Sequence, residues 1–298
     1  MENRHNICSL ITIYKPNVIK LKQNIQIISQ YSDCVYLLCN SPEFFEIQFD
    51  NKIKIIRNNK NIGISRAINK GIDMALNDGY SYAVLFDQDS ILTKENFSKL
   101  ILEMLNESKI SKVACIGPSL NVRNNTIPKY SWIINRKRVH SANIISVNNI
   151  ITSGMLVNIK QFINIEGFHE DFPVDFCDFI FCWKSIYNGY SVIQSKDVYL
   201  NHEIGDGSIK IFNRTIHFHA PYRNYFLVRD TLNICFRIKE TPLLIRFRYF
   251  FSLPFRMFVF LLLLENKKTR LKMYWWGFKD FFLKKKHFGS IANLLGAE

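Results

Sequence analysis

Two carboxylates one residue apart, Asp87 and Asp89, are the side chains of this sequence that most directly indicate chemistry. They follow the apolar run of residues 83–86 and precede a polar turn. Burying charge is costly unless something pairs with it, so two acids at the end of an apolar strand favour a bound cation. Hard cations such as Mg²⁺ take oxygen ligands and often share them with substrate phosphates. The pair therefore predicts an enzyme that handles a nucleotide diphosphate through a divalent metal, although the same pattern also occurs in ordinary solvated turns.

A third acid, Asp178, lies in the first turn of a helix that we expect over residues 175–188. The helix dipole favours a charged carboxylate there, and a catalytic base must be ionised and close to the hydroxyl that it deprotonates. Asp175 is the better N-cap, which leaves Asp178 available. The alternative is a first-turn acid without chemistry. His202 follows a strand and could contact a metal or a diphosphate, or it could simply be satisfied by hydrogen bonds.

Residues 61–71 form a glycine-bearing loop that opens a helix, with Arg66 and Lys70 in the first two turns. Helix N-termini attract anions. The segment is neither a Walker loop nor a dinucleotide-binding fingerprint, because the required spacings are missing.

The elements that must position these residues alternate between strand and helix patterns. Strands are expected over residues 7–14, 34–39, 52–56 and 81–86, and helices over 18–30 and 64–77. Such alternation predicts an α/β fold with a mostly parallel sheet flanked by helices, and ligands of such sheets bind beyond the carboxyl ends of the strands. In the second half, helices are expected over 96–106 and 175–188, and strands over 112–116, 152–157 and 191–200.

The composition is that of a globular protein with an uneven charge. The 298 residues carry a formal charge of +14, and from Arg237 onward 13 Lys and Arg residues face 4 Asp and Glu residues. The seven cysteines form no CxxC pair, which predicts reduced thiols in a cytosolic protein. Residues 1–5, Met-Glu-Asn-Arg-His, lack the apolar run of a signal peptide, so secretion is not expected.

The strongly apolar residues 250–264 raise the question of a membrane. The run is too short to span, since a spanning helix needs about 20 apolar residues, and Pro254 and Arg256 interrupt it. Basic and aromatic residues follow it, which favours an amphipathic helix lying on an anionic membrane surface. The alternative is a buried C-terminal helix with a solvated basic face.

Taken together, the motifs resemble the family 2 glycosyltransferases of GT-A fold, and most of all their bacterial rhamnosyltransferase branch. The resemblance covers residues 7–230, and Asp-Gln-Asp-Ser at residues 87–90 points to the rhamnosyl branch. The matching segments are residues 12–16, 61–72, 86–90, 152–154, 167–168, 174–178, 189–190, 202–206 and 222–224.

The resemblance implies a GT-A, Rossmann-like sheet and a role for each matching residue. Asp87 and Asp89 would hold Mg²⁺ or Mn²⁺ on the donor diphosphate, Asp178 would deprotonate the acceptor hydroxyl, and His202 would lie near the diphosphate and metal. The other donor-binding residues expected from the matching segments are Tyr14, Asn40, Asn61, Gly63 and Arg66.

The chain departs from the family pattern at three positions. Cys39 stands where the family has an acid that contacts the nucleobase, so Asn40 or a neighbouring group would have to replace it. Ile180 replaces a second acid after the catalytic one, and Lys184 replaces an Arg, which keeps the charge but loses the bidentate fork.

We therefore expect a catalytic domain at residues 1–235, with a nucleotide-sugar-binding half at 1–95 and an acceptor half at 96–235. Residues 236–298 would form a basic, aromatic helical tail that associates with membranes. The expected reaction is metal-dependent, inverting transfer of L-rhamnose from dTDP-L-rhamnose to a lipid-linked cell-surface polysaccharide of O-antigen or capsule type. The acceptor would be a saccharide on polyprenyl diphosphate at the cytoplasmic face of a bacterial plasma membrane.

Two alternatives stay open at this point. The donor could be another hexose, such as UDP-galactofuranose or UDP-glucose. The chain could also be a non-catalytic protein that binds membranes or nucleic acid. Its sequence pI of about 9.4 would permit nucleic-acid binding, but the charge lies beside apolar runs and no nucleic-acid-binding motif is recognised, so no nucleic-acid partner is expected.

Overall fold

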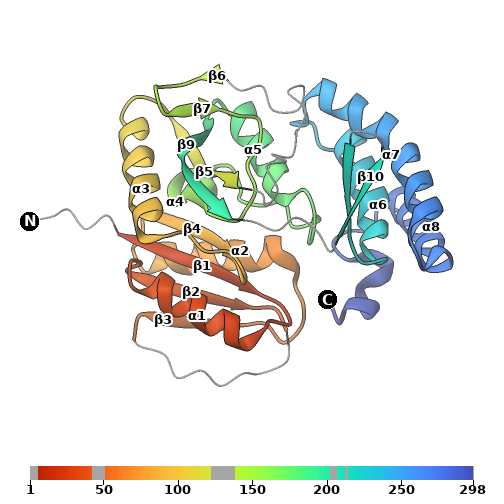
Figure 1. Ribbon diagram of the computed structural model, residues 1–298, viewed down its shortest axis with the longest axis horizontal. Helices are drawn as coiled ribbons and strands as arrows, with labels where there is room; N and C mark the ends of the chain where they lie inside the picture. Colours follow the sequence, from red (N-terminus) through yellow and green to blue (C-terminus); the bar gives the residue numbers. More distant parts are fainter. Residues whose placement is uncertain (1–5, 42–50, 122–137, 202–206, 212–213, 298) are drawn as a thin grey trace, which may run out of the picture.

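A nine-stranded mixed sheet with helices on both faces forms the larger part of the computed structural model (Figure 1). The structure describes residues 6–41, 51–121, 138–201, 207–211 and 214–297. Helices α6, α7 and α8 gather beside this α/β body (Figure 1). The predicted α/β fold is confirmed.

The first half of the chain builds four adjacent parallel strands in the order β3-β2-β1-β4. These strands and the helices between them are β1 (Ile7–Ile13), α1 (Val18–Ser29), β2 (Cys34–Cys39), β3 (Ile53–Arg57), α2 (Gly63–Asn77) and β4 (Tyr82–Asp87). In β1 the side chains of Ile7, Ile11 and Ile13 enter one apolar cluster while those of Cys8 and Leu10 enter the other. Both faces of the strand are therefore buried, which is why these strands read as nearly continuous apolar runs.

The two faces are covered by different helices. Apolar residues of α1 and of α3 (Lys94–Ser108) pack in one cluster, and those of α2 and of α5 (Cys177–Tyr187) pack in the other. The carboxyl ends of β1, β2 and β4 meet at one edge, with Thr12 opposite Asp87 and Ile13 opposite Cys39. The first acid thus lies where a parallel sheet binds its ligands.

The second half of the chain extends the sheet with strands of both directions. Its order continues from β4 as β8-β5-β9-β7-β6, in which only β5 and β9 are parallel. The elements are β5 (Val113–Asn121), β6 (Arg138–Val139), β7 (Ile144–Ser146), β8 (Met155–Asn158), α4 (Ile159–Asn164) and β9 (Ser191–Asn201). A separate antiparallel pair joins β10 (Gly207–Ile211) to β11 (Arg214–Phe218).

The C-terminal part consists of α6 (Arg223–Phe236), α7 (Leu243–Leu263), α8 (Lys267–Phe282) and the short 3₁₀ helix η1 (Gly289–Leu295). Helix α7 continues through Pro254, which interrupts the apolar run of the sequence but not the helix. Proline removes one helical hydrogen bond, but apolar residues on both sides of it pack against α6 and α8. Within the described residues, no helix is both long and apolar enough to cross a membrane.

Candidate active site

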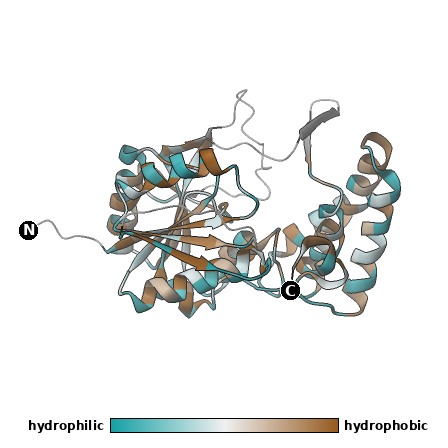
Figure 2. Cartoon of the chain, turned by 90° about the horizontal axis from the view of Figure 1, so that it is seen from below, coloured by the Kyte–Doolittle hydropathy of each residue, from teal (hydrophilic) through white to brown (hydrophobic). Residues whose placement is uncertain are grey.

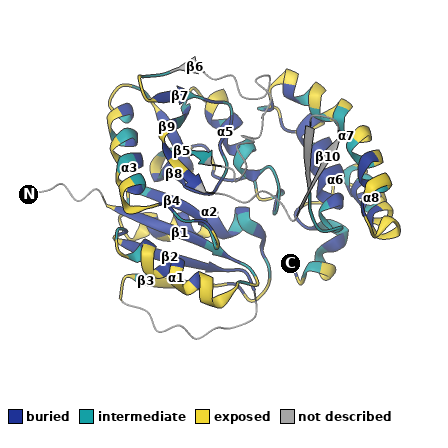
Figure 3. Cartoon of the chain, in the orientation of Figure 1, coloured by how far each residue is buried: buried dark blue, intermediate teal, exposed yellow. Residues whose placement is uncertain are grey.

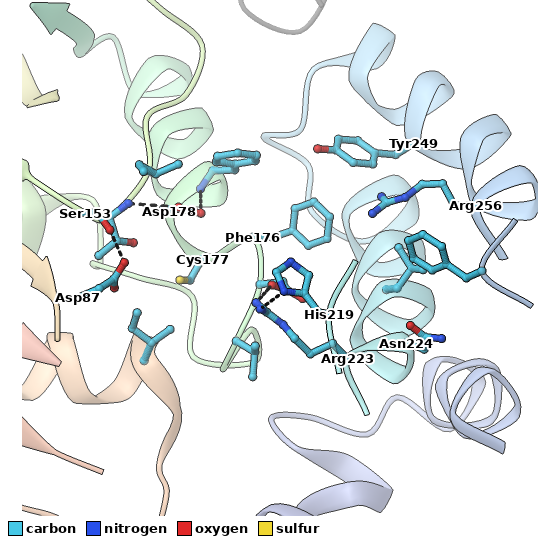
Figure 4. Close-up of a pocket in the computed structure, with 18 residues that line it drawn as sticks. Asp87, Ser153, Phe176, Cys177, Asp178, His219, Arg223, Asn224, Tyr249 and Arg256 are labelled. Atoms are coloured by element: carbon cyan, nitrogen blue, oxygen red, sulfur yellow. Dashed lines mark hydrogen bonds and ion pairs between the residues drawn. The ribbon is translucent and has the colours of Figure 1, made fainter. Parts of the chain in front are cut away.

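A cavity of about 510 Å³ opens between the carboxyl end of β4 and the helices α5, α6 and α7. Asp87 and Asp178 both line it, from segments 91 residues apart in the sequence. Arg223 and Arg256 line it from the side of the C-terminal helices (Figure 4). With Asp175, which also lines it, the cavity therefore brings three acids together with two arginines of the C-terminal helices.

Asp87 is fixed by the turn that precedes β8. The Ser153 hydroxyl donates a hydrogen bond to the Asp87 carboxylate (Figure 4). The next residue, Gly154, has φ +75°, a backbone conformation that glycine adopts without steric cost, and its N–H bonds the Leu85 carbonyl at 2.8 Å. The Ser-Gly pair thus ties this turn to the end of β4 and orients the acid.

Asp178 lies in the first turn of α5, as predicted, in a setting that raises its proton affinity. The N–H groups of Phe179 and Thr152 donate to its carboxylate over 2.8 and 3.3 Å. Burial is the largest influence and raises the pKa of this carboxyl from 3.8 to about 7, with smaller contributions from Asp87 and Asp175. The two backbone bonds oppose this rise. A base with a pKa near neutrality is well suited to accept a proton at neutral pH.

The start of α5 carries backbone strain. Phe176, the residue before the helix, has φ +67°, which costs of order 1 kcal/mol or more for a bulky residue. Its ring packs edge-on against Tyr249 of α7, with centroids 5.3 Å apart. The N-cap is therefore Phe176 rather than the predicted Asp175, whose carboxylate instead pairs with the guanidinium of Arg223.

Arg223 connects this pair to the segment before α6. Its Nη2 donates to Asp175 Oδ1, and its Nη1 lies 2.9 Å from the Nδ1 atom of His219. Asp175 and Arg223 thus neutralise each other within the cavity wall. Their direct contact could not be predicted from the sequence, since 48 residues separate them.

The predicted donor-binding residues gather at the ends of β1 and β2 and at the start of α2. The Nδ2 atom of Asn40 donates to the Gly63 carbonyl at 3.0 Å, and Asn61 Oδ1 accepts the Gly63 N–H at 2.9 Å. Tyr14 and Asn61 both contact the end of η1: the Tyr14 hydroxyl donates to the Leu295 carbonyl at 3.4 Å and the Asn61 N–H to the Gly296 carbonyl at 3.2 Å. These four residues are therefore neighbours, but they lie outside the lining of the described cavity, and their donor-binding role stays a prediction.

The backbone at Gly63 has neither the conformation nor the space for a larger residue. Its φ is +75°, and a Cβ atom would lie 2.5 Å from the Cβ of Pro173. The adjacent Ile64 N–H bonds the Pro173 carbonyl at 2.8 Å, so the start of α2 is joined to the loop that leads into α5. Arg66, one turn along α2, forms an ion pair with Glu170 at 3.1 Å.

The two predicted metal ligands from β4 differ in their surroundings. Asp87 faces the cavity, whereas Asp89 is exposed and makes no hydrogen bond or ion pair within the described part of the chain. His202 lies outside the described residues. Among the described residues, no group of three or more His, Cys, Asp or Glu side chains is arranged so that it could hold a metal ion.

The residues of this strand end fit a divalent cation nonetheless. Asp87 and Asp89 supply carboxylate oxygens at the mouth of the sheet, and magnesium usually takes one or two protein carboxylates together with water and substrate phosphates. Among the described residues, no side chain pairs with the Asp89 carboxylate, so none competes with a metal ion for it. The roles of both acids stay predictions.

Sequence reasoning did not identify Tyr249 and Arg256, which line the cavity from α7. Arg256 lies in the middle of an apolar run, where a charge needs a reason to be buried. The sequence shows this charge, but there it indicates only a break in the apolar run of residues 250–264.

Comparison with known proteins agrees with the resemblance. Residues 41–162 match the family model described as Glycosyl transferase family 2. The chain is 26% identical over 278 residues to the dTDP-rhamnosyl transferase RfbF of Shigella flexneri, covering 90% of this chain and 91% of that protein.

Solved structures of low sequence identity share the fold. GalNAc-T7 with UDP, GalNAc and Mn²⁺ superposes with a TM-score of 0.54 at 11% identity, over 95% of this chain and 58% of the other. S. aureus TarS 1–349 in complex with UDP-GlcNAc gives a TM-score of 0.54 at 12% identity, over 93% of this chain and 80% of the other. Both matches cover nearly the whole chain.

Proposed function

Because the chain carries a family 2 glycosyltransferase domain and is a glycosyltransferase similar to a rhamnosyl transferase, we propose that it transfers L-rhamnose from dTDP-L-rhamnose with inversion. The acceptor in this proposal is a lipid-linked saccharide of a cell-surface polysaccharide. The observation that carries the proposal is the shared cavity of Asp87 and Asp178. A strand-end carboxylate facing a buried, near-neutral carboxylate suits a diphosphate leaving group on one side and an acceptor hydroxyl on the other.

In the proposed reaction, Asp178 accepts the proton of the acceptor hydroxyl. The hydroxyl oxygen forms a bond to the anomeric carbon while the bond from that carbon to the donor diphosphate breaks, and the electron pair leaves with the diphosphate. Thr152 and Phe179 hold the Asp178 carboxylate through their N–H groups, which orients the base and limits its rotation. A single displacement by one base gives inversion at the sugar carbon.

Asp87 and Asp89 are the proposed ligands of Mg²⁺ or Mn²⁺, whose contribution when bound is to neutralise charge on the leaving diphosphate. Ser153 fixes the Asp87 side chain in the orientation in which it lines the cavity. His202 stays a proposed neighbour of the diphosphate. The solved structure of GalNAc-T7 includes Mn²⁺ together with UDP, which supports divalent metal use on the basis of a shared fold.

The donor assignment rests on the similarity to RfbF and on the Asp-Gln-Asp-Ser sequence at residues 87–90. UDP-galactofuranose and UDP-glucose are the competing donors. Cys39, at the end of β2, is a small buried thiol where the family has an acid. The nucleobase is then held through other contacts, for which the neighbouring Asn40 is the proposed residue.

The C-terminal helices are proposed to lie on the cytoplasmic leaflet of the bacterial plasma membrane. Exposed positions recur along α7 and α8 (Figure 3), where hydrophobic and hydrophilic residues alternate (Figure 2), and many of the exposed residues are apolar or basic. The exposed apolar residues of α7 are Leu243, Leu244, Phe247, Phe250, Phe251, Phe255, Phe258, Leu262 and Leu263. The exposed basic residues of α7, of α8 and of the segment directly after α8 are Arg248, Lys267, Lys268, Lys272, Lys279, Lys284, Lys285 and Lys286. A surface that is both apolar and cationic complements an anionic bilayer.

The donor is tested by measuring nucleotide release from dTDP-L-rhamnose, UDP-galactofuranose and UDP-glucose, with Mg²⁺, Mn²⁺ or EDTA, in the presence of lipid-linked acceptors. We expect metal-dependent release of dTDP above the rates for both UDP sugars, and loss of release in Asp178→Asn. Faster release of UDP from either competing donor would contradict the rhamnosyl assignment. Unchanged turnover in Asp178→Asn would contradict the assignment of the base.

Membrane binding is tested by flotation with vesicles of phosphatidylglycerol or phosphatidylcholine. The wild type is expected to float with the anionic vesicles, and a variant with Phe251, Phe255 and Phe258 changed to Ser is expected to stay in solution. Serine at the exposed Leu76, Leu102 and Ile110, which lie outside the C-terminal helices, is the matched control. Equal flotation of the two triple variants would refute the assigned surface.

A further inference from the structure

Arg256 lies in the cavity wall, and none of the described residues forms an ion pair with its guanidinium. It extends from α7 into the cavity (Figure 4). Among the described residues its guanidinium makes no hydrogen bond or ion pair. The other arginine of the cavity, Arg223, is already held by Asp175. Arg256 is therefore available to an anion that enters the cavity.

The surroundings of Arg256 make an unpaired charge unfavourable. The side chain is partly buried next to Tyr249 and Phe260, which lie on the same face of α7 at helical spacing. Burial lowers the pKa of the Arg256 guanidinium, while Tyr249 and Asp175 raise it by weaker electrostatic effects. Because a guanidinium stays protonated, this cost is relieved by an anionic ligand and not by loss of the proton. The planar guanidinium could donate two parallel N–H hydrogen bonds to a phosphate group.

The position of Arg256 identifies the side of the cavity on which that anion binds. Asp87, at the end proposed for the donor diphosphate, lies across the cavity from α7, with Phe176 between them (Figure 4). Asp178 lies beside Asp87 on that same side, since the two acids bond to the consecutive residues Thr152 and Ser153 (Figure 4). Arg256 is therefore separated from the end of the cavity at which the leaving diphosphate is proposed to lie, so the anion that it contacts belongs to the acceptor.

The opposite face of α7 indicates what the acceptor anion is attached to. Phe251, Phe255 and Phe258 are 71%, 56% and 64% exposed, within one and a half turns of Arg256. One short stretch of helix thus offers a phosphate-binding group toward the cavity and aromatic rings toward the outside. A phosphate ester with an apolar chain matches both faces at once, whereas a soluble sugar phosphate matches only one.

We propose that Arg256 binds the phosphate through which the acceptor saccharide is joined to an apolar chain, and so recognises a lipid phosphate. This assignment rests on the proposed function, because it presumes that Asp87 marks the donor end of the cavity. It adds a specificity residue: Arg256 selects acceptors by their phosphate, and the outer face of α7 receives the chain that leaves the cavity.

Binding of farnesyl diphosphate, measured by calorimetry with saturating dTDP and Mg²⁺, tests the proposal, because dTDP then blocks the donor end. The wild type is expected to bind farnesyl diphosphate, Arg256→Gln to bind at least tenfold more weakly, and Arg256→Lys to retain part of the affinity. Lys22→Gln removes an equal charge from an exposed position of α1, outside the C-terminal helices, and is expected to bind like the wild type.

Farnesol and inorganic pyrophosphate separate the two parts of the ligand, and both are expected to bind much more weakly than farnesyl diphosphate. Equal affinity of Arg256→Gln and wild type for farnesyl diphosphate would overturn the proposal. So would pyrophosphate that binds the wild type as tightly as farnesyl diphosphate, because the site would then be a general anion site.

Acceptor-independent hydrolysis of dTDP-L-rhamnose distinguishes this proposal from the proposed function. We expect Arg256→Gln to hydrolyse the donor at the wild-type rate. A selective loss of hydrolysis in Arg256→Gln assigns the side chain to the donor and overturns the proposal. If the wild type hydrolyses no nucleotide sugar but binds farnesyl diphosphate through Arg256, the proposed reaction fails while lipid-phosphate recognition stands.

Discussion

Replacement of the proposed base by its neutral isostere should remove activity and stabilise the fold. In Asp178→Asn, the proton acceptor is lost, and we expect kcat to fall by about 10²–10⁴, the usual contribution of general acid–base catalysis. The same change removes a carboxylate whose charged form is disfavoured by burial. The variant should therefore be more stable than the wild type wherever Asp178 would be ionised.

The size and the pH window of this effect follow from the raised pKa. An acid with a higher pKa in the folded state binds its proton more tightly when folded, so wild-type stability falls as the pH rises from 3.8 to about 7 and is constant above that. At about 1.4 kcal/mol per pH unit, the upper limit is about 4 kcal/mol. Water in the open cavity reduces this penalty, and Asn resembles the neutral carboxyl group that folded Asp178 carries at pH 4. We expect a gain of about 2 kcal/mol at pH 8 and none at pH 4.

Urea unfolding of both proteins in EDTA, between pH 4 and pH 8, measures the difference directly. Asp175→Asn is the matched control, because it also removes an acid of the cavity but breaks the ion pair with Arg223. It should gain no stability as the pH rises. The reasoning is refuted if Asp178→Asn is no more stable than the wild type at pH 8, or if its gain is the same at pH 4 and pH 8.

Three further perturbations test other parts of the structure. Asp89→Asn should lower donor turnover and raise the Mg²⁺ concentration needed for half-maximal rate by tenfold or more, while urea unfolding without metal stays unchanged because the side chain is exposed; an unchanged metal requirement would remove Asp89 from the ligands. Gly63→Ala should destabilise the protein by about 2 kcal/mol or more, since the new Cβ meets Pro173 at a positive φ, and urea unfolding that matches the wild type would contradict that geometry. Arg229→Met should lower the free energy of unfolding by about 3 kcal/mol or more in the same assay at pH 8, because it leaves the buried Asp230 carboxylate without the guanidinium that lies 2.6 Å away. An unchanged free energy of unfolding would show that the ion pair does not stabilise the fold.

The sequence was sufficient to predict the first half of the fold, since each buried strand and each amphipathic helix there is a local pattern. The four parallel strands and the strand-end position of Asp87 followed from this. The start of α5 did not: Asp175 is a favourable N-cap by type, but its pairing with Arg223 takes it away from the helix. Such a long-range ion pair leaves no local trace in the sequence.

The residues that the C-terminal helices contribute to the site could not be predicted from the sequence either. The apolar pattern of residues 250–264 indicated a helix, and it predicted an exposed apolar face, which the structure has. It did not show that the other face of the same helix closes a cavity, because Tyr249 and Arg256 reach it only through packing against α5 and α6. Position in a sequence alone cannot tell a snorkelling arginine from an inward one.

The contacts between η1 and the first loops have a consequence for the order in which the enzyme is completed during translation. The Tyr14 hydroxyl bonds the Leu295 carbonyl and the Asn61 N–H bonds the Gly296 carbonyl, so the loops after β1 and before α2 wait for residues that are made much later. At roughly 5–20 residues per second, the interval between Tyr14 and Leu295 is of the order of 15 to 60 s. A nascent chain can assemble its parallel strands in that time, but these two contacts form only when residues 295–296 have left the ribosome.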